Sequence, residues 1–333
     1  MKAMLCTHYG PPEEMELREL PSPAPGPNQV LIAVKACGVN FPDVLMLADK
    51  YQFKPPLPFA PGGEVAGTVK ALGDGVTGFK IGDRVAVSTG SGGFAEEVLA
   101  DARRCVLVPA NVSFEVASAF IVTYGTSYHA LKDRARLKAG EHLVVLGAAG
   151  GVGLSAVELG VAMGAKVIAG ASSQEKVDLA IKHGATAGFV YPKLPLSRDQ
   201  QKAMSDKIKE LTGGQGADVL YDPVGDQYAE PALRAMNWEG RYLVIGFAAG
   251  EIPKIPLNLT LLKGCDVLGV FWGAYTGRNP KAANDSLREI IAMIADGKLK
   301  PDVSATFPLA QAGKSIRMLM DRKAMGKVVV TMG

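Results

Sequence analysis

The chain has 333 residues, of which 48% are hydrophobic and 21% are charged. This balance is typical of a folded globular protein and excludes intrinsic disorder, and the length exceeds that of a single core, so two lobes are expected. The net charge of +3 comes from 36 basic and 33 acidic residues scattered along the sequence, which argues against a nucleic-acid partner.

The N-terminal sequence and the cysteines indicate the compartment. The first residues, MKAMLCTHYGPPEEMEL, lack the apolar core of a secretory signal. The four cysteines lie far apart, which predicts neither a disulfide framework nor a zinc knuckle. The most apolar stretch, residues 143–171, contains Glu158, Lys166 and many glycines, so it is not expected to span a membrane. The sequence therefore predicts a cytoplasmic protein without a membrane partner.

The first third of the chain consists of short apolar runs, such as QVLIAVKACGV, GEVAGTVKALG and DRVAV. Turn signals, such as PAPGPN and GDGVTG, separate these runs. This pattern predicts an irregular antiparallel β lobe with few helices, which forms a partly open barrel.

From about Val122, apolar runs of strand length alternate with segments of helix length. Strands are predicted at residues 142–146, 166–169, 188–190, 219–221 and 242–245. Helices are predicted at residues 151–163, 174–183, 199–211 and 227–236. This alternation indicates a doubly wound parallel α/β sheet, in which ligands bind at the carboxyl ends of the strands.

The chain after Pro256 contains a strand (CDVLGVFW), two helices (DSLREIIAMIADG and residues 309–321) and a last strand (GKVVVTM). These elements are predicted to return to the first lobe, so that the parallel sheet is inserted into it. The predicted domains are residues 1–122 and 259–333 for the catalytic lobe and residues 123–258 for the nucleotide-binding domain.

A glycine turn, GAAGGVG, joins the first predicted parallel strand to its helix. Ala148, Gly150 and Gly153 occupy the three small positions of a dinucleotide-binding fingerprint. Gly150 would let the backbone approach a pyrophosphate, and Gly153 would let the helix pack closely on the strand. Small residues also serve close packing alone, but the flanking strand and helix favour a cofactor site.

The next strand ends without the acidic residue that usually holds a ribose 2′-hydroxyl. Ser172 and Ser173 stand there instead, and Lys176 follows one helical turn later. Two hydroxyl donors and a positive charge suit a 2′-phosphate, which a carboxylate would repel. Glu175 is the rival acid, but it is expected to face solvent. The sequence therefore predicts NADPH as the cofactor.

Motifs along nearly the whole chain are similar to those of the medium-chain dehydrogenase/reductase superfamily, and within it of the zinc-free NADPH:quinone oxidoreductases. The motifs are ACGVNFPDVL, KYQFKPPLPFAPGGEVAGTV, GDRV, GGFAEEV, TYGTSYHAL, GAAGGVG, WEGRYLVIGFAAG and VFWGAY. The resemblance implies an α/β fold with an irregular β-barrel-like, GroES-like catalytic lobe and a doubly wound Rossmann domain.

The resemblance also predicts that no catalytic zinc is bound. Zinc-dependent members of the superfamily have a Cys ligand where this chain has Asn40 and a His ligand where it has Gly63. The region of their third ligand, near Ser118, has neither Cys nor His. Because a catalytic zinc needs three protein ligands, no metal is expected here.

Particular residues take functional roles from the resemblance. Asn40 and Tyr51 are implied as catalytic residues near the nicotinamide, although Leu45 replaces a second tyrosine that some relatives have. Cofactor contacts are predicted for Asn40, Tyr51, Thr126, Gly150, Gly151, Val152, Ser172, Ser173, Lys176, Tyr191, Gly246, Phe247, Ala248, Phe271, Trp272, Gly273 and Arg322. The alternative role for Tyr51, Phe271 and Trp272 is that of core aromatics. Asp43 and Glu64 are expected to be paired structural carboxylates rather than acid or base catalysts.

The predicted activity is NADPH-dependent hydride transfer to a small molecule, a quinone or a related α,β-unsaturated carbonyl. This chemistry needs close contact in a dry site but no metal, and for an enone Tyr51 is the predicted proton donor. An enoyl-thioester reductase and a non-catalytic NADPH-binding protein are the alternatives. A homodimer is expected, formed through the apolar CDVLGVFW strand.

Overall fold

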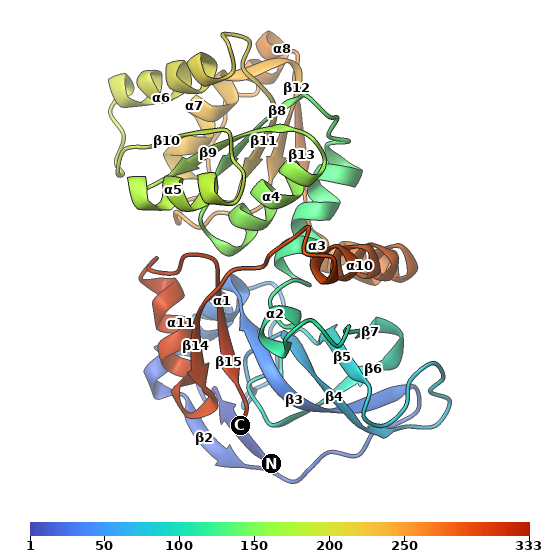
Figure 1. Cartoon of the computed structure of the whole chain (residues 1–333). Helices are drawn as coiled ribbons and strands as arrows, with labels where there is room; N and C mark the ends of the chain where they lie inside the picture. Colours follow the sequence, from blue (N-terminus) through green and yellow to red (C-terminus); the bar gives the residue numbers. More distant parts are fainter. The chain divides into compact units, whose positions relative to one another are not determined.

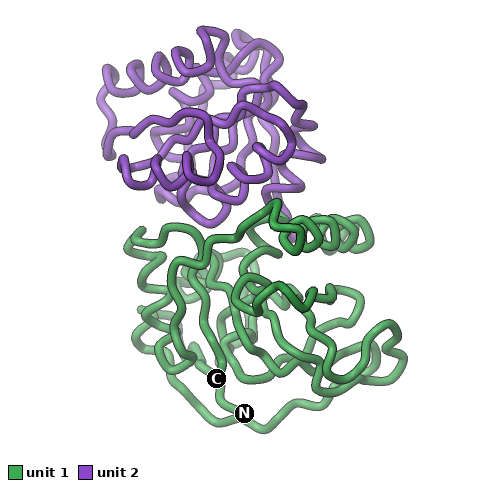
Figure 2. Tube along the Cα trace, viewed as in Figure 1, with its two compact units in different colours: residues 1–125, 275–333 green, residues 126–274 purple.

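The computed structural model describes residues 1–333 and divides into two compact units (Figure 2). The first comprises Met1–Gly125 and Tyr275–Gly333, and the second comprises Thr126–Ala274. The chain enters the second unit within helix α3 (Thr123–Tyr128) and leaves it within helix α9 (Trp272–Arg278). The second unit thus continues well beyond residue 258, where the sequence pattern had placed its end.

The first unit is built on a mixed sheet with the strand order β14-β15-β3-β4-β5-β7, in which β14 and β15 are parallel and all other pairs, including β6 with β3, are antiparallel. β1 and β2 form a separate two-stranded sheet. The strands are β1 (Lys2–Leu5), β2 (Glu16–Glu19), β3 (Gln29–Val39), β4 (Glu64–Leu72), β5 (Arg84–Ser88), β6 (Glu97–Asp101), β7 (Val106–Leu107), β14 (Val303–Pro308) and β15 (Lys327–Thr331). The register between β3 and β4 shifts at two places, which bends the long β3 strand. The predicted irregular β lobe is therefore confirmed.

Four helices and a closely packed core complete the first unit. The helices are α1 (Phe41–Leu47), α2 (Phe114–Ala117), α10 (Pro280–Ala295) and α11 (Ala312–Met320). The centre of the core is fully buried, with 0% exposure at Val30, Ile32, Val65, Phe94 and Val330. These residues come from both ends of the sequence, so the C-terminal segment is an integral part of this lobe.

The second unit is a doubly wound parallel sheet with the strand order β10-β9-β8-β11-β12-β13 (Figure 1). Its strands are β8 (His142–Leu146), β9 (Lys166–Ala171), β10 (Ala187–Val190), β11 (Ala217–Asp222), β12 (Met236–Val244) and β13 (Asp266–Gly269). Its helices are α4 (Gly151–Ala162), α5 (Gln174–Lys182), α6 (Arg198–Leu211), α7 (Ala229–Arg234) and α8 (Asn258–Lys263). The strand order reverses between β8 and β11, which is the point where such sheets bind ligands.

The assignment of the CDVLGVFW segment to the first lobe was wrong. Its strand, β13, pairs in parallel with β12, with Tyr242 opposite Val267 and Leu243 opposite Leu268. A strand of only four residues carries no local signal of its partner, so the long-range pairing was not predictable from its composition.

Helices cover both faces of this sheet. α6, α7 and α8 share a core with Val144 and Leu220 on one face. α4 packs on the opposite face so closely that a side chain on Gly160 would lie 2.5 Å from Leu143 Cδ2. This contact fixes the helix that begins at the glycine turn.

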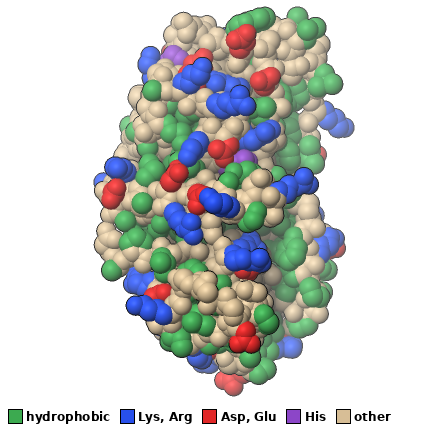
Figure 3. Space-filling model, turned by 90° about the vertical axis from the view of Figure 1, so that its right-hand side faces the viewer, with side chains coloured by type: hydrophobic (Ala, Val, Ile, Leu, Met, Phe, Trp, Pro, Cys, Tyr) green, Lys and Arg blue, Asp and Glu red, His purple; other side chains and the backbone are tan.

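Two surface properties complete the description. No helix of the structure is both long and apolar enough to cross a membrane. Basic and acidic side chains are interspersed over the face shown in Figure 3, without a continuous patch of one sign.

Candidate active site

The residues predicted to contact the cofactor in the second unit follow the carboxyl ends of its parallel strands. They come after β8 (Gly150, Gly151, Val152), β9 (Ser172, Ser173, Lys176), β10 (Tyr191), β12 (Gly246, Phe247, Ala248) and β13 (Phe271, Trp272, Gly273). Because parallel strands end at the same edge of a sheet, the fold brings these segments to one edge.

Three of the four glycines in the turn after β8 have different structural roles. Gly147 has φ 60°, which is the left-handed conformation that favours glycine. A Cβ on Gly153 would lie 2.1 Å from the Gly147 carbonyl oxygen, so this position admits no side chain. A Cβ on Gly150 would meet nothing closer than 3.4 Å. Packing inside the protein therefore demands Gly153, whereas Gly150 keeps open the side of the backbone that a phosphate would approach.

The loop after β9 ends in the N-terminus of α5. Ser173 caps this helix and accepts from the Lys176 N–H at 3.4 Å, and Lys176 Nζ donates to Ser172 Oγ at 3.4 Å. Ser172 and Glu175 are exposed, with Glu175 in the first turn of the helix. The hydroxyls and the ammonium group predicted to bind a 2′-phosphate thus lie together, and no carboxylate follows the strand directly.

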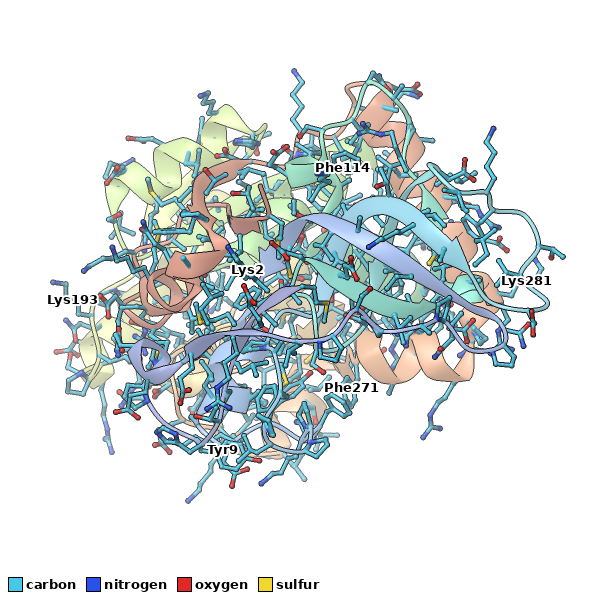
Figure 4. All side chains as sticks on the ribbon, turned by 90° about the horizontal axis from the view of Figure 1, so that it is seen from below. Lys2, Tyr9, Phe114, Lys193, Phe271 and Lys281 are labelled. Atoms are coloured by element: carbon cyan, nitrogen blue, oxygen red, sulfur yellow. The ribbon has the colours of Figure 1, made fainter.

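The aromatic residues at this edge divide into buried and exposed side chains. Tyr191 is 8% exposed and its ring lies 4.7 Å from that of Tyr228. Trp272 is 6% exposed and lies 6.1 Å from the His129 ring. Both therefore support the strand-end loops as core aromatics. Phe271, labelled in Figure 4, is 58% exposed, which is not expected of a core residue.

The loop after β12 is bound to the end of β11 by backbone hydrogen bonds. The Gly246 N–H donates to the Asp222 carbonyl at 3.3 Å, and the Ala248 N–H donates to the Pro223 carbonyl at 3.0 Å. The Phe247 N–H between them makes no hydrogen bond within the protein. A loop held on both sides of one open donor is suited to contact a bound amide or carbonyl group.

A buried polar cluster in the first unit surrounds Asn40, between β3 and α1. Asn40 Nδ2 donates to Glu64 Oε2 at 2.8 Å, and Asn40 Oδ1 accepts from Lys327 Nζ at 2.7 Å. Lys327 Nζ also donates to Glu64 Oε2 at 3.1 Å and to the Val39 carbonyl at 3.2 Å. Asn40, Glu64 and Lys327 are 8%, 0% and 4% exposed. Both polar atoms of the Asn40 amide are thus held by a buried ion pair.

Asp43 binds the backbone of the same cluster. Its carboxylate accepts from the Asn40 N–H at 2.8 Å and from the Gly62 N–H at 2.9 Å. Burial raises the pKa of Asp43 to about 6, although these donors and the charge of Lys327 oppose the rise. Partial burial and the negative charge of Asp43 raise the pKa of Tyr51. Asp43 and Glu64 are structural, but they bind Asn40 from two sides and are not paired with each other.

The residues of this cluster do not fit a catalytic zinc ion. No three His, Cys, Asp or Glu side chains are grouped so that they could hold a metal. A Cβ on Gly63, where zinc-dependent relatives have a histidine, would lie 2.8 Å from the Gly90 carbonyl oxygen. The ammonium group of Lys327 would in addition repel a second cation beside Asn40.

Two predicted cofactor residues lie elsewhere in the chain. Thr126 is in α3, at the start of the second unit. Arg322 is exposed in the turn after α11, in the first unit, with φ 56°. Their predicted contacts stay predictions.

Four residues of these sites were not predicted from the sequence. Gly147 is the first residue of the GAAGGVG motif, and its place directly after a strand was a signal for a left-handed turn. Lys327 was visible as a charge at the start of the apolar run KVVVT, and Asp222 as a charge between VLY and a PVG turn. Tyr242, which donates to the Asp222 carboxylate, carried no signal of its own.

Two family models match the chain, the alcohol dehydrogenase GroES-like domain over residues 26–110 and the zinc-binding dehydrogenase over residues 151–293. A quinone oxidoreductase-like protein 2 homolog from Nematostella vectensis is 39% identical over 99% of this chain and 88% of its own length. This similarity over the whole chain confirms the resemblance that the motifs indicated.

Two solved structures share the fold. A mycobacterial protein complexed with NADPH has a TM-score of 0.91 and 30% identity, over 99% of this chain and 100% of its own. Escherichia coli quinone oxidoreductase complexed with NADPH has a TM-score of 0.90 and 28% identity, with the same coverage. The chain belongs to the quinone oxidoreductase family of the medium-chain dehydrogenase/reductase superfamily, and it is an oxidoreductase.

Proposed function

We propose that this protein uses NADPH to reduce quinones or related α,β-unsaturated carbonyls, by direct hydride transfer without a metal ion. The observation that carries the choice of NADPH is the loop after β9, where Ser172, Ser173 and Lys176 lie together without a carboxylate. The similar structures solved with NADPH support the same cofactor.

The second unit has the groups that a dinucleotide requires. The first turn of α4 presents backbone N–H groups without partners in the helix, as at any helix N-terminus, and its 12 residues give it a substantial dipole. Gly150 leaves the approach to these groups open. We propose that Gly150, Gly151 and Val152 bind the pyrophosphate, and that Phe247 offers its open N–H at the nicotinamide end.

For this reaction the main task of the protein is to position the cofactor and the substrate. NADPH, when bound, supplies a hydride from its nicotinamide ring. A reduced quinone can take its protons from water, so that the protein needs no general acid for this substrate class. The buried ion pair of Lys327 and Glu64 fixes the orientation of the Asn40 amide. We propose that this uncharged group helps to orient the substrate and does not exchange protons with it.

An α,β-unsaturated carbonyl needs a proton at carbon, and Tyr51 is the proposed donor. Partial burial and the charge of Asp43 raise the pKa of Tyr51, so its hydroxyl remains protonated at neutral pH. The phenol therefore carries, at neutral pH, the proton that the reaction transfers to carbon, and water can restore this proton afterwards.

The test is a steady-state assay of NADPH oxidation with a panel of quinones, enones and enoyl thioesters. Turnover of quinones or enones is the expected result. Preferential turnover of enoyl thioesters would replace the proposed substrate class, and tight NADPH binding without turnover of any acceptor would remove the catalytic proposal.

We further propose a homodimer and a cytoplasmic location. β13 is the last strand of its sheet, so its outer edge has no partner in the chain, and Val267 on this strand is 43% exposed. Leu261 and Leu262, in the preceding helix α8, are 79% and 68% exposed. An apolar edge of this kind can pair with that of a second copy. The four cysteines are free and buried, as is usual in a reducing compartment.

A further inference from the structure

Two buried tyrosines lie on adjacent strands of the second unit, and neither was assigned a role by the sequence. Tyr221 on β11 and Tyr242 on β12 are 0% and 1% exposed. Tyr221 is aligned with Leu243, and Tyr242 with Leu220. Because side chains alternate between the faces of a sheet, the two rings lie on opposite faces. Their hydroxyl groups therefore serve different surroundings.

The Tyr242 hydroxyl donates to the Asp222 carboxylate at the end of β11. The other carboxylate oxygen accepts from the Val224 N–H at 2.7 Å and from the Gly225 N–H at 2.9 Å. Asp222 is 3% exposed, so each of these bonds lies away from bulk water. This one carboxylate fixes the turn that follows β11, and Tyr242 in turn holds the carboxylate.

The turn after β11 holds the loop after β12. The Ala248 N–H donates to the Pro223 carbonyl, and the Ala249 N–H donates to the Val224 carbonyl at 2.9 Å. A Cβ on Gly225 would lie 2.9 Å from the Phe247 ring, so the two segments are closely packed. Phe247, with its open N–H, is therefore positioned through Asp222 and Tyr242.

The Tyr221 hydroxyl belongs to a different network. It lies 2.8 Å from Ser127 Oγ, which lies 2.8 Å from Ser155 Oγ. Both serine hydroxyls reach the Val152 carbonyl, at 3.0 and 2.9 Å. Val152 is in the first turn of α4, so this network holds the turn whose N–H groups face the proposed pyrophosphate.

We propose that Tyr242 and Tyr221 are positioning residues for different halves of the cofactor, Tyr242 for the nicotinamide half through Asp222 and Tyr221 for the pyrophosphate through Ser127 and Ser155. This inference rests on the proposed function, because it assigns NADPH to this strand edge. Neither tyrosine is placed to touch the cofactor itself. Each keeps one loop in the conformation that binds it.

The test compares Tyr242→Phe with Tyr221→Phe, since each variant loses a single buried hydroxyl and is the control for the other. The ligands are NADPH and 2′-phospho-ADP-ribose, which lacks only the nicotinamide. Tyr242→Phe should raise the Kd for NADPH about five- to tenfold and leave the Kd for 2′-phospho-ADP-ribose unchanged. Tyr221→Phe should raise both Kd values by the same factor.

Turnover gives a second readout that a general loss of stability would not produce. With a quinone acceptor, Tyr242→Phe should lower kcat, because the nicotinamide is displaced, whereas Tyr221→Phe should raise KM for NADPH at unchanged kcat. If Tyr242→Phe does not fold, Asp222→Asn replaces it with the same expected pattern.

The inference would be overturned if Tyr242→Phe raised the Kd values of both ligands equally or changed neither. The proposed cofactor would still stand in that case, provided that the wild-type protein binds NADPH. Failure of the wild-type protein to bind NADPH would overturn the proposed function and the inference with it. The two failures are therefore distinguishable in one titration series.

Discussion

Lys176 is the single residue on which the choice between NADPH and NADH depends most directly. Its ammonium group lies 3.4 Å from Ser172 Oγ, beside the N-terminus of α5. We expect Lys176→Ala to raise KM for NADPH about tenfold at nearly constant kcat, because a charge-assisted contact to the 2′-phosphate is lost equally from the ground and transition states. Steady-state kinetics with both cofactors would measure this, and KM for NADH should change little.

Lys182→Ala is the matched control for this prediction. Lys182 is exposed in the last turn of the same helix, so its removal changes the net charge equally without reaching the phosphate loop. Arg322→Ala is expected to resemble Lys176→Ala if the predicted contact of Arg322 with the 2′-phosphate exists. Equal losses with NADPH and NADH would contradict the phosphate role of either residue.

Asp43 predicts a pH dependence of stability. Burial raises its pKa from 3.8 to about 6 in the folded chain, so folding favours the protonated form. The stabilisation from this group is fully present below pH 3.8 and is lost as the pH rises through about 6. The shift corresponds to about 3 kcal/mol of unfolding free energy.

Asp43→Asn removes this titration and an acceptor for one of the two N–H groups. The variant should therefore be less stable than wild type at about pH 4, and the difference should narrow by about 2–3 kcal/mol at about pH 7. Urea unfolding at a series of pH values measures both free energies. A difference that stays constant over this range would show that the Asp43 carboxyl does not titrate as its burial requires.

At the scale of elements, the glycine turn separates a structural role from a binding role. Gly150 has φ −78°, and a Cβ there would meet no atom closer than 3.4 Å, so Gly150→Ala should fold with nearly wild-type stability. The added methyl group would nevertheless stand between the backbone and the pyrophosphate, so the Kd for NADPH should rise more than about tenfold.

Gly153→Ala is the converse variant. Its Cβ would lie 2.1 Å from the Gly147 carbonyl oxygen, so α4 must move away from β8 at a cost of about 1–3 kcal/mol. Thermal unfolding and NADPH titration of both variants would measure the contrast. These assignments would be contradicted if Gly150→Ala were destabilised, or if neither variant bound NADPH more weakly than the wild type.

The predictability of the elements follows from the range of the interactions that form them. The strand at 142–146 and the helices after it were predicted nearly residue by residue, because buried parallel strands and capped helices have strong local patterns. β14 was missed because its side chains alternate between partly buried and exposed at a sheet edge, without an apolar run. β12 begins at Met236, earlier than predicted, because the exposed Trp238 and Glu239 interrupt the apolar pattern of its first half.

The same reasoning applies to the site. The dinucleotide loops follow single strands, so the residues after β8 and β9 were found from the sequence. Lys327 and Asn40 are 287 positions apart, and their contact depends on the pairing of β15 with β3. No local sequence pattern indicates such a contact. The cluster that holds the Asn40 amide could therefore be identified only from the structure.

At the scale of the whole molecule, the exposed edge of β13 predicts the assembly. We expect the wild-type protein to sediment with twice the mass of one chain, and Val267→Asp to shift it toward the monomer, because a carboxylate on the strand would be desolvated in the interface. Ile81→Asp, which alters a 67% exposed side chain in the first unit, is the control and should stay dimeric. Sedimentation velocity distinguishes the species, and a monomeric wild type would exclude this interface.

The central claim is that the chain is an NADPH-dependent reductase of quinones or enones. The most direct measurement is the steady-state comparison of NADPH and NADH as donors, with a quinone as the acceptor. We predict that kcat/KM with NADPH exceeds that with NADH by about tenfold or more, as expected for one or more charge-assisted contacts to the 2′-phosphate. Equal values with both donors, or no oxidation of NADPH by any quinone or enone while the protein still binds it, would contradict the account.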